Sequence, residues 1–427
     1  MKRKLGSFLS RLRNDSKGNI LLLAGAGMTV LVGGAGLGVD TVNWYLWKRQ
    51  MQQAVDTSAT AGALSLFQGH NWEDAANSEL ARTANTAFTV ESIARPPASG
   101  AFAGDTSAVE VIATTSRVLP FSSLFMSQAP TIRTRAVATA VGVGNPCVRA
   151  LATSGTGVEV FGGANVDLDC PVSSNSPGGV SVDVGGSSYL NTDLIMSVGG
   201  IDYGEGNVPN DAAIVSYGLP VEDPLADRDM GSKPNGAPIN NFRVGPSETT
   251  TMNPGTYRNG ITLQGTATLN EGTYWIEGGS LSINSGAVVQ LAPGARGVTF
   301  VLTNNGSGPI ATVSINGGAS VDISATTQAM DAANGTDYAG ILFFQDRNGS
   351  NQRSTINGGA GINLEGAIYM PRGDLTYNGA ATQSAQCLLI VTERVRFGGE
   401  NKIENDNNCN NDLTAIDSQA RVIRVVE

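Results

Sequence analysis

The longest apolar stretch of the chain lies near its start. Residues 20–39 contain no charged side chain and consist mostly of Leu, Val, Ala and Gly. Because a helix rises about 1.5 Å per residue, this stretch is about 30 Å long, which is the thickness of the hydrocarbon core of a bilayer. The pattern predicts a single transmembrane helix over residues 18–39.

A cleaved secretory signal is the alternative interpretation of this stretch. Such a signal has a shorter apolar core and small residues at its cleavage site, whereas Asp40 and an aromatic cluster at residues 44–47 follow here. Retention as an anchor is therefore favoured. Gly34 and Gly38 form a G-x-x-x-G pair that predicts close packing against a second helix. The other interpretation of the pair is that glycine is simply common in membrane helices.

Residues 40–145 mix helical and strand patterns. Small and apolar residues recur at spacings of four through residues 51–63, which predicts that the membrane helix continues beyond the bilayer as one long rod. A second helix is expected over residues 72–88. Two β-branched runs, at residues 108–115 and 132–141, predict strands that pack on the helices in a small α+β module.

A repeat with a different pattern follows residue 146. Each unit reads as a strand, a tight Asn/Gly turn and a second strand, and one apolar residue precedes each turn. These marker residues are Val160, Val184, Leu263, Ile283, Ile315, Ile356 and Tyr377. Most intervals between markers are one or two units of about twenty residues, which is a solenoid spacing. The repeat predicts a mainly β domain over residues 146–427, a parallel β-helix, with a β-sandwich of Asn-Gly hairpins as the alternative.

Two further features of the repeat predict details of the structure. Asn284, Asn316 and Asn357 recur at one place in the pattern and are expected to stack as a ladder. Residues 201–256 interrupt the repeat with Pro, Asp and Gly, which predicts a loop insertion over one face. This insertion includes an acidic group at residues 222–229, which is expected to be a solvated loop rather than a catalytic carboxylate pair.

The distribution of charge predicts how the transmembrane helix is oriented. Six basic residues and one acidic residue give residues 1–17 a net charge of +5, and the positive-inside rule places this tail in the cytoplasm. Because the whole chain carries −10, the remainder carries −15. An acidic exported region has no basic patch suited to nucleic acid, so no nucleic-acid partner is expected.

All four cysteines follow the apolar stretch, and an even number of cysteines in an exported region indicates disulfide bonds. We expect the local pairs Cys147–Cys170 and Cys387–Cys409, although the sequence alone allows three pairings. Metal or redox chemistry is disfavoured because the chain has no C-x-x-C and only one histidine, His70, which is expected at the surface of a helix junction.

Catalytic signatures were sought and not found. Strings of the form D-x-S-x-T begin at Asp56 and Asp322, but the first lies on the predicted long helix and the second inside the repeat, so neither has the strand-end loop of a metal site. The chain also lacks a P-loop and a G-x-S-x-G elbow. We therefore expect no enzymatic activity, no bound metal and no cofactor.

Two strings that flank the apolar stretch carry a resemblance. They are Asp15-Ser-Lys-Gly-Asn-Ile20 before it and Gln50-Met-Gln-Gln-Ala-Val-Asp-Thr-Ser-Ala-Thr-Ala-Gly-Ala-Leu64 after it, and Gly38-Val-Asp40 places an aspartate at the far end of the stretch. Together they resemble the TadE/TadG-like proteins of the Tad/Flp pilus-assembly system, which also carry an aspartate at that end. The resemblance covers residues 13–66 and, more loosely, the strand pair to Gly144. Prepilin processing at Gly18 is not expected, because Leu23 stands where that processing requires Glu.

The resemblance implies a protein of the bacterial inner membrane with a periplasmic or exported C-terminal part. We expect a structural or interaction component of a Tad/Flp-type pilus-assembly or secretion system, with other pilus-assembly or envelope proteins as partners. The alternative is a membrane-tethered β-helix that binds or cleaves polysaccharide, with possible glycan contact by the β domain through residues 223–229.

Overall fold

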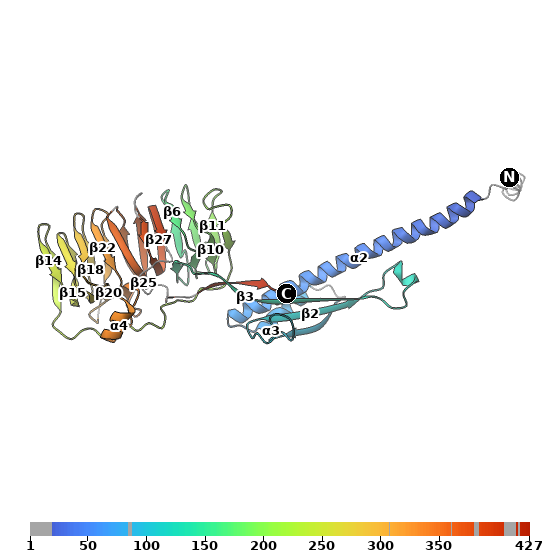
Figure 1. The fold of residues 1–427 in the computed structure, drawn as a ribbon, viewed down its shortest axis with the longest axis horizontal. Coiled ribbons are helices and arrows are strands. Elements are labelled where there is room, and N and C mark those ends of the chain that lie inside the picture. The colour runs from blue at the N-terminus through green and yellow to red at the C-terminus, as the bar shows by residue number, and fades with distance from the viewer. Residues whose placement is uncertain are drawn as a thin grey trace, which may run out of the picture. The chain divides into compact units, whose positions relative to one another are not determined.

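The computed structural model describes residues 19–427 apart from 84–87, 307, 360, 380–383, 405–415 and 417–418. The basic tail over residues 1–17 lies outside the described residues. The chain divides into two compact units, one formed by residues 1–141 together with 423–427 and the other by residues 142–422. Figure 1 labels their helices and strands.

The first unit is built on one long helix, α2 (Asn19–Phe67), of 49 residues. The helix begins in the apolar stretch and continues without a break into the α+β module, as the sequence predicted. Helix α3 (Trp72–Thr83) follows a turn in which the His70 N–H donates to the Ser65 carbonyl at 2.9 Å. It packs on α2, where the Ser58 hydroxyl donates to the Ala76 carbonyl at 2.7 Å.

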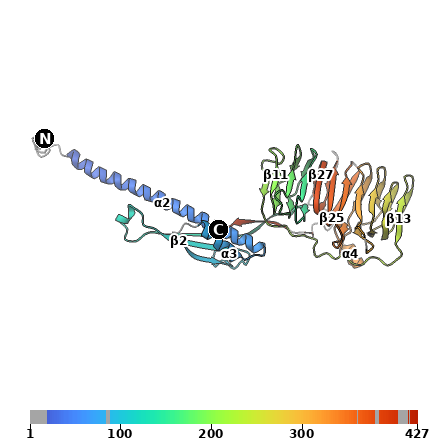
Figure 2. The same ribbon diagram turned by 180° about the vertical axis from the view of Figure 1, so that it is seen from behind.

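A four-stranded sheet in the order β1-β2-β3-β28 completes the first unit, and Figure 2 shows β2 beside α2. The strands are β1 (Thr89–Ala94), β2 (Val109–Ser116), β3 (Thr131–Gly144) and β28 (Ala420–Val425), with the short helix η1 (Ser122–Leu124) between β2 and β3. Met51, Val55 and Ala59 of α2 are fully buried against β2 residues such as Val109. Because β28 belongs to this sheet, the second unit is inserted between β3 and β28.

The second unit is a parallel β-helix. Every pairing between its described strands is parallel, which excludes the β-sandwich alternative. Its first segment holds β4 (Val148–Ala150), β5 (Val158–Val160), β6 (Asn165–Leu168), β7 (Val172–Ser174), β8 (Val182–Val184), β9 (Tyr189–Asn191), β10 (Leu194–Ser197), β11 (Ile201–Tyr203) and β12 (Ala213–Val215).

The second segment of the β-helix supplies the larger share of its strands. They are β13 (Ile239–Val244), β14 (Thr249–Met252), β15 (Gly255–Leu263), β16 (Thr266–Leu269), β17 (Gly272–Glu277), β18 (Ser280–Ile283), β19 (Val288–Leu291), β20 (Val298–Thr303), β21 (Thr312–Ile315), β22 (Ser320–Ser324), β23 (Ile341–Gln345), β24 (Gln352–Asn357), β25 (Ile362–Gly379), β26 (Ser384–Gln386) and β27 (Leu388–Glu404). One short helix, α4 (Gln328–Asn334), lies between β22 and β23.

The marker residues of the repeat form one interior column. Leu263 pairs with Ile283, then Ile283 with Ile315, Ile315 with Ile356 and Ile356 with Tyr377. The column continues through Phe397 to Val160 and Val184, so all seven markers stand in the predicted register. Each of these side chains is at most 2% exposed. Their burial explains the apolar residue before each turn.

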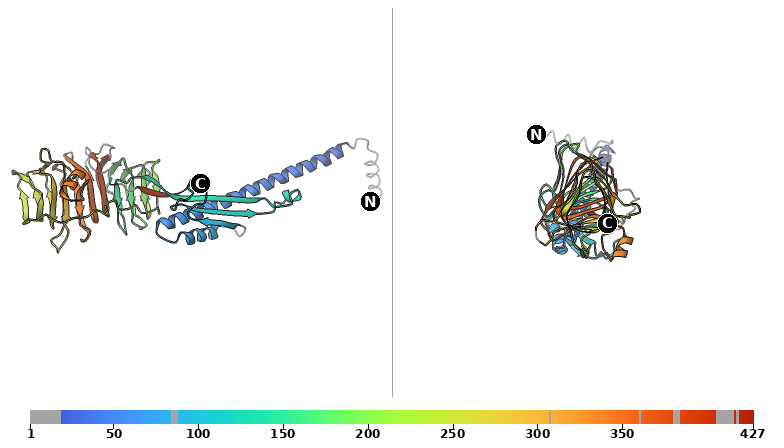
Figure 3. Two further views of the ribbon diagram at one scale, coloured as in Figure 1. Left: turned by 60° about the horizontal axis from the view of Figure 1, so that its bottom comes forward. Right: turned by 90° about the vertical axis from the view of Figure 1, so that its left-hand side faces the viewer.

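The coils do not stack in sequence order. Strand β27 pairs with β25 on one side and with β4, β5 and β6 on the other. In Figure 1 the stack therefore runs from yellow-green β14 through orange β22 and red β27 to teal β6 and green β11. The left view of Figure 3 shows the same row of coils. In space, the coils of the first segment therefore stack on β27 at the end of the second segment, and the two segments form one solenoid.

A strap, residues 216–238, connects the end of the first segment to the start of the second. It carries no helix or strand, whereas β11, β12, β13 and β14 all fall within residues 201–256, which the sequence assigned to a loop. Leu225 of the strap is fully buried in an apolar cluster on the outer wall, together with Trp275 and Phe344. The strap is therefore a packed element.

Aromatic side chains fill the interior of the second segment. Phe242, Tyr257, Tyr274, Phe300 and Phe343 follow one another on successive coils, with ring centroids 5.3–6.0 Å apart. The two buried hydroxyls are satisfied, because Tyr257 donates to the Asn253 carbonyl and Tyr274 to the Met252 carbonyl. This stack was not expected from the marker pattern.

Candidate membrane anchor and assembly interface

The first half of α2 exposes large apolar side chains, whereas the second half buries its own. Met28, Leu31 and Val32 are 69%, 73% and 61% exposed, while Met51 is fully buried. Residues 24–67 contain a helix long and apolar enough to cross a membrane. A continuous exposed apolar surface of this kind marks contact with a membrane or another protein. The structure thus supports the predicted anchor.

The glycines of the anchor face two different surroundings. A β-carbon built on Gly34 or Gly38 meets nothing within 4 Å, so the predicted helix-packing face is open. At Gly36 the same atom lies 2.5 Å from the Phe121 ring. Because two residues advance about 200° around a helix, Gly36 lies on the side opposite Gly34 and Gly38. One side of the helix receives a loop, and the other remains free for a partner.

Asp40 fixes that loop to the helix. Its carboxylate accepts hydrogen bonds from the Phe121 N–H at 3.0 Å, from the Ser122 N–H and from the Ser122 hydroxyl at 2.6 Å. The side chain is 1% exposed. A buried carboxylate is tolerated only with such donors. Sequence reasoning noted this aspartate as a feature of the resemblance but found no role for it, since its donors lie 81 and 82 residues away.

Aromatic and cationic side chains alternate beyond Asp40. The Lys48 ammonium lies 5.6 Å from the centroid of the Trp44 ring, and the Arg117 guanidinium lies 5.2 Å from that of Trp47. Cations over indole faces are stabilised by the ring quadrupole. Because tryptophans and basic residues concentrate where a membrane meets water, this segment fits one boundary of the span.

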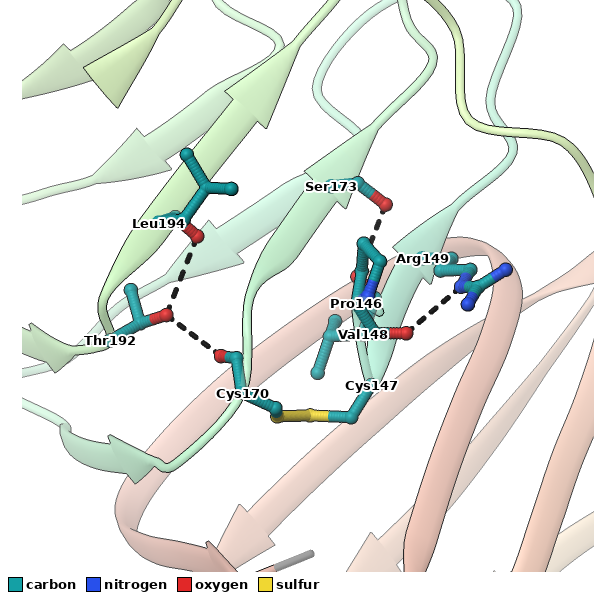
Figure 4. The surroundings of a disulfide bond; sticks show 8 residues. All are labelled: Pro146, Cys147, Val148, Arg149, Cys170, Ser173, Thr192 and Leu194. Atoms are coloured by element: carbon teal, nitrogen blue, oxygen red, sulfur yellow. Dashed lines mark hydrogen bonds between the residues drawn. A yellow bond between two sulfur atoms is a disulfide. The ribbon is translucent and has the colours of Figure 1, made fainter. Parts of the chain in front are cut away.

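The first predicted disulfide is present. Cys147 and Cys170 are bonded with their α-carbons 5.8 Å apart, and they join the coils that begin at β4 and β7 (Figure 4). The Thr192 hydroxyl donates to the Cys170 carbonyl at 2.8 Å and extends the contact to the next coil. Cys387 is also disulfide-bonded. Its predicted pairing with Cys409 lies outside the described residues.

The acidic group at residues 222–229 lies in the strap, where the Asp223 side chain is partly buried and makes contacts with the outer wall. The Tyr369 hydroxyl donates to the Asp223 carboxylate at 2.8 Å, and Arg228 forms an ion pair with Asp337. Arg347 secures the same stretch by donating to the Arg228 carbonyl at 2.9 Å. These contacts hold part of the strap on the outer wall, whereas Glu222, Asp227 and Asp229 remain exposed, as predicted for a solvated loop.

A groove of about 370 Å³ on the β-helix is lined by residues of β19, β22 and β25. The Asn363 amide donates to the Asp322 carboxylate at 3.0 Å there. Burial, assisted by the nearby Asp322 charge, raises the pKa of the Glu365 carboxyl. Among the described residues, no group of three or more His, Cys, Asp or Glu side chains could hold a metal ion.

The two D-x-S-x-T strings take ordinary structural roles. Asp56 on α2 accepts a hydrogen bond from the Gln52 amide at 2.7 Å, and the Thr60 hydroxyl caps the Asp56 carbonyl one turn earlier. Asp322 lies in the middle of β22. Asn357 of the expected asparagine ladder accepts a hydrogen bond at 2.8 Å from the amide of Asn378, which the prediction did not include. The second string runs over the end of β22, where the Thr326 hydroxyl donates to the Tyr338 carbonyl at 3.1 Å.

Comparison with known proteins adds one finding. The family model described as putative Flp pilus-assembly TadE/G-like matches residues 18–65, which is almost the whole of α2. The matched residues include the open Gly34 and Gly38 face and the Asp40 tether. No curated protein and no solved structure matches the chain. The N-terminal helix of this chain is thus similar to the putative Flp pilus-assembly TadE/G-like family.

Proposed function

We propose that the chain is a membrane-anchored structural or interaction component of a Tad/Flp-type pilus-assembly or secretion system, with no enzymatic activity. The single observation that carries this proposal is the family match over residues 18–65. The matched helix has an apolar half suited to a bilayer and an open face at Gly34 and Gly38. Small residues on such a face let a second helix approach closely, so other pilus-assembly proteins are the proposed partners.

The proposed location is the bacterial inner membrane, with the N-terminus in the cytoplasm and the β-helix in the periplasm or beyond. The basic residues before the span support this orientation. The Cys147–Cys170 disulfide supports it independently, because disulfides persist in oxidising compartments.

The β-helix is proposed to act as a rigid body that the anchor displays. Its interior is filled on every coil, and both its entry at β3 and its exit at β28 belong to the sheet of the anchoring unit.

The proposal is tested in the source bacterium by removing the chain and counting surface pili by electron microscopy. The full chain should restore the pili. A matched version with Gly34→Leu and Gly38→Leu, which still spans the membrane, should restore fewer. Unchanged piliation after removal of the chain would refute the proposal.

Polysaccharide binding is a second candidate, favoured by the polar groove at Asp322, Asn363 and Glu365. Within residues 223–229, Asp223 and Arg228 already bind Tyr369 and Asp337, so this segment supports the candidate less than the groove does. The test is retention of the full-length protein on immobilised envelope polysaccharide, compared with Asn363→Ala. Equal elution of both proteins with the solvent front would remove this candidate.

A further inference from the structure

The connection between β2 and β3, residues 117–130, has an unusual composition for an exposed loop. After Arg117 it contains no charged side chain through residue 130. Leu124 and Phe125 at its tip are 76% and 82% exposed, and Val118 is 68% exposed. A soluble protein rarely leaves such residues together in water, so this apolar tip requires a covering.

The position of the tip along α2 identifies the covering. The Phe121 ring lies against Gly36, which is three residues, or about 5 Å, inside the end of the uncharged stretch at Val39. Asp40 holds the backbone of Phe121 and Ser122 at the same level. If α2 spans a bilayer as proposed, these contacts place the tip at the edge of the hydrocarbon core.

The base of the loop lies on the aqueous side. Arg117 stacks on Trp47, which is eight residues, or about 12 Å, beyond Val39. The interfacial layer on each side of the hydrocarbon is only about 5–8 Å thick. The loop therefore descends from water through the headgroup level to the hydrocarbon edge, and it becomes uncharged as it does so.

We propose that residues 118–126 form a second membrane contact, in which Leu124 and Phe125 enter the exported leaflet beside α2. The occupant of this apolar surface is lipid, since Phe121 lies against Gly36 in the exposed apolar half of the helix that is proposed to cross the bilayer. The loop occupies the Gly36 side of the helix, so the Gly34 and Gly38 face stays available to a partner. Two contacts with the bilayer would fix the rotation of the anchoring unit about the helix axis, which one helix alone leaves free.

The test uses the full-length protein in vesicles of phosphatidylcholine and phosphatidylglycerol with no other protein present. Single cysteines introduced as Val32→Cys, Phe125→Cys and His70→Cys carry an environment-sensitive fluorophore, and lipids with a quencher near the headgroup or deep in the acyl chain report its depth. The unsubstituted protein controls for labelling of native cysteines. Leu124→Cys provides a second, independent position at the tip.

The proposal predicts strong quenching at Phe125 and Leu124 by the shallow quencher, quenching at Val32 by the deep quencher, and none at His70. Probes at Phe125 and Leu124 that are as unquenched as His70, while Val32 remains quenched, would overturn the second contact and leave the anchor intact. That result would indicate a protein covering for the tip. Loss of quenching at Val32 as well would contradict the anchor on which this inference rests.

Discussion

At the scale of single residues, Asp40 joins two segments that the sequence keeps far apart. Its carboxylate satisfies two backbone N–H groups and one hydroxyl of the β2–β3 loop while it stands at the end of an apolar helix. The local sequence explains why a charged residue ends the apolar stretch but not what the charge binds. Its role becomes visible only when Ser122 is folded back onto the helix.

We expect Asp40→Ala to release the loop. The N–H groups of Phe121 and Ser122 would lose their acceptor, and buried donors without a partner are unfavourable. Limited proteolysis of the full-length protein in detergent should therefore cut residues 117–130 faster than in the unsubstituted protein. Asp56→Ala is the matched control, because Asp56 accepts its side-chain hydrogen bond from Gln52 of the same helix. Identical cleavage rates for the Asp40 variant and the control would contradict the tether.

Glu277 makes the stability of the contact between the strap and the β-helix wall depend on pH. Its carboxylate is 2% exposed and accepts hydrogen bonds from Lys233 and Arg258, each at 2.8 Å. Burial alone would raise the pKa of Glu277, but the hydrogen bonds from the two cations outweigh it and the pKa is lowered. The unfolded chain then binds the proton more readily than the folded chain, so this stabilisation is complete above the ordinary glutamate pKa and is lost as the pH falls through the folded pKa.

The corresponding measurement is thermal unfolding of the full-length protein over a series of acidic pH values. The unsubstituted protein should lose more stability on acidification than Glu277→Gln, which has no carboxyl to titrate at this site. Glu271→Gln is the control for an exposed ion pair, which contributes little. Parallel pH profiles for the unsubstituted protein and Glu277→Gln would show that the strap contact has no such role.

At the scale of elements, β27 joins the two segments of the solenoid. Arg396 on β27 donates to Glu159 on β5 through two hydrogen bonds of 2.7 and 3.0 Å, and its guanidinium lies 4.6 Å from the centroid of the Phe161 ring. At the neighbouring corner, Gly398 occupies a position that has no room for a side chain. A β-carbon there would lie 2.4 Å from the Asn378 side-chain oxygen and 3.1 Å from the Phe161 ring.

Gly398→Ala should therefore destabilise the second unit by about 1–3 kcal/mol, the usual cost of inserting a methyl group into a packed site. Asn378 cannot easily move aside, because its amide is hydrogen-bonded to Asn357. Chemical denaturation would measure the free energy of unfolding. Gly179→Ala is the matched control, since a β-carbon at Gly179 meets nothing within 4 Å and no large change is expected. Equal stability of the two variants would contradict the packing described at this corner.

The elements that the sequence could predict are those with local signals. The marker residues, from Val160 to Tyr377, stand in their predicted register because burial and a tight turn are both encoded within a few residues. The position of β27 between β25 and β4 could not be predicted, because it depends on a strap that crosses several coils. Phe397, the column residue that links Tyr377 to Val160, was missed for the same reason.

At the scale of the whole molecule, the β-helix is an insertion in the sheet of the anchoring unit. The Val137 N–H donates to the Glu427 carbonyl, and the Val426 N–H donates to the Val137 carbonyl, both at 2.8 Å. The sequence analysis assigned residues 146–427 as a whole to the β domain, since strand patterns do not encode the partner of a strand such as β28. A faithful version of the anchoring unit must therefore retain residues 423–427 and replace only residues 142–422.

The proposed role in pilus assembly is best tested by crosslinking in native membranes followed by purification of the chain. It compares the full-length protein with a version in which a short flexible linker replaces residues 142–422. We expect both proteins to recover pilus-assembly components, because the family-matching helix is common to them. Recovery of such components by neither protein would contradict a role in pilus assembly, and recovery by the full-length protein alone would move the partner contact from the helix to the β-helix.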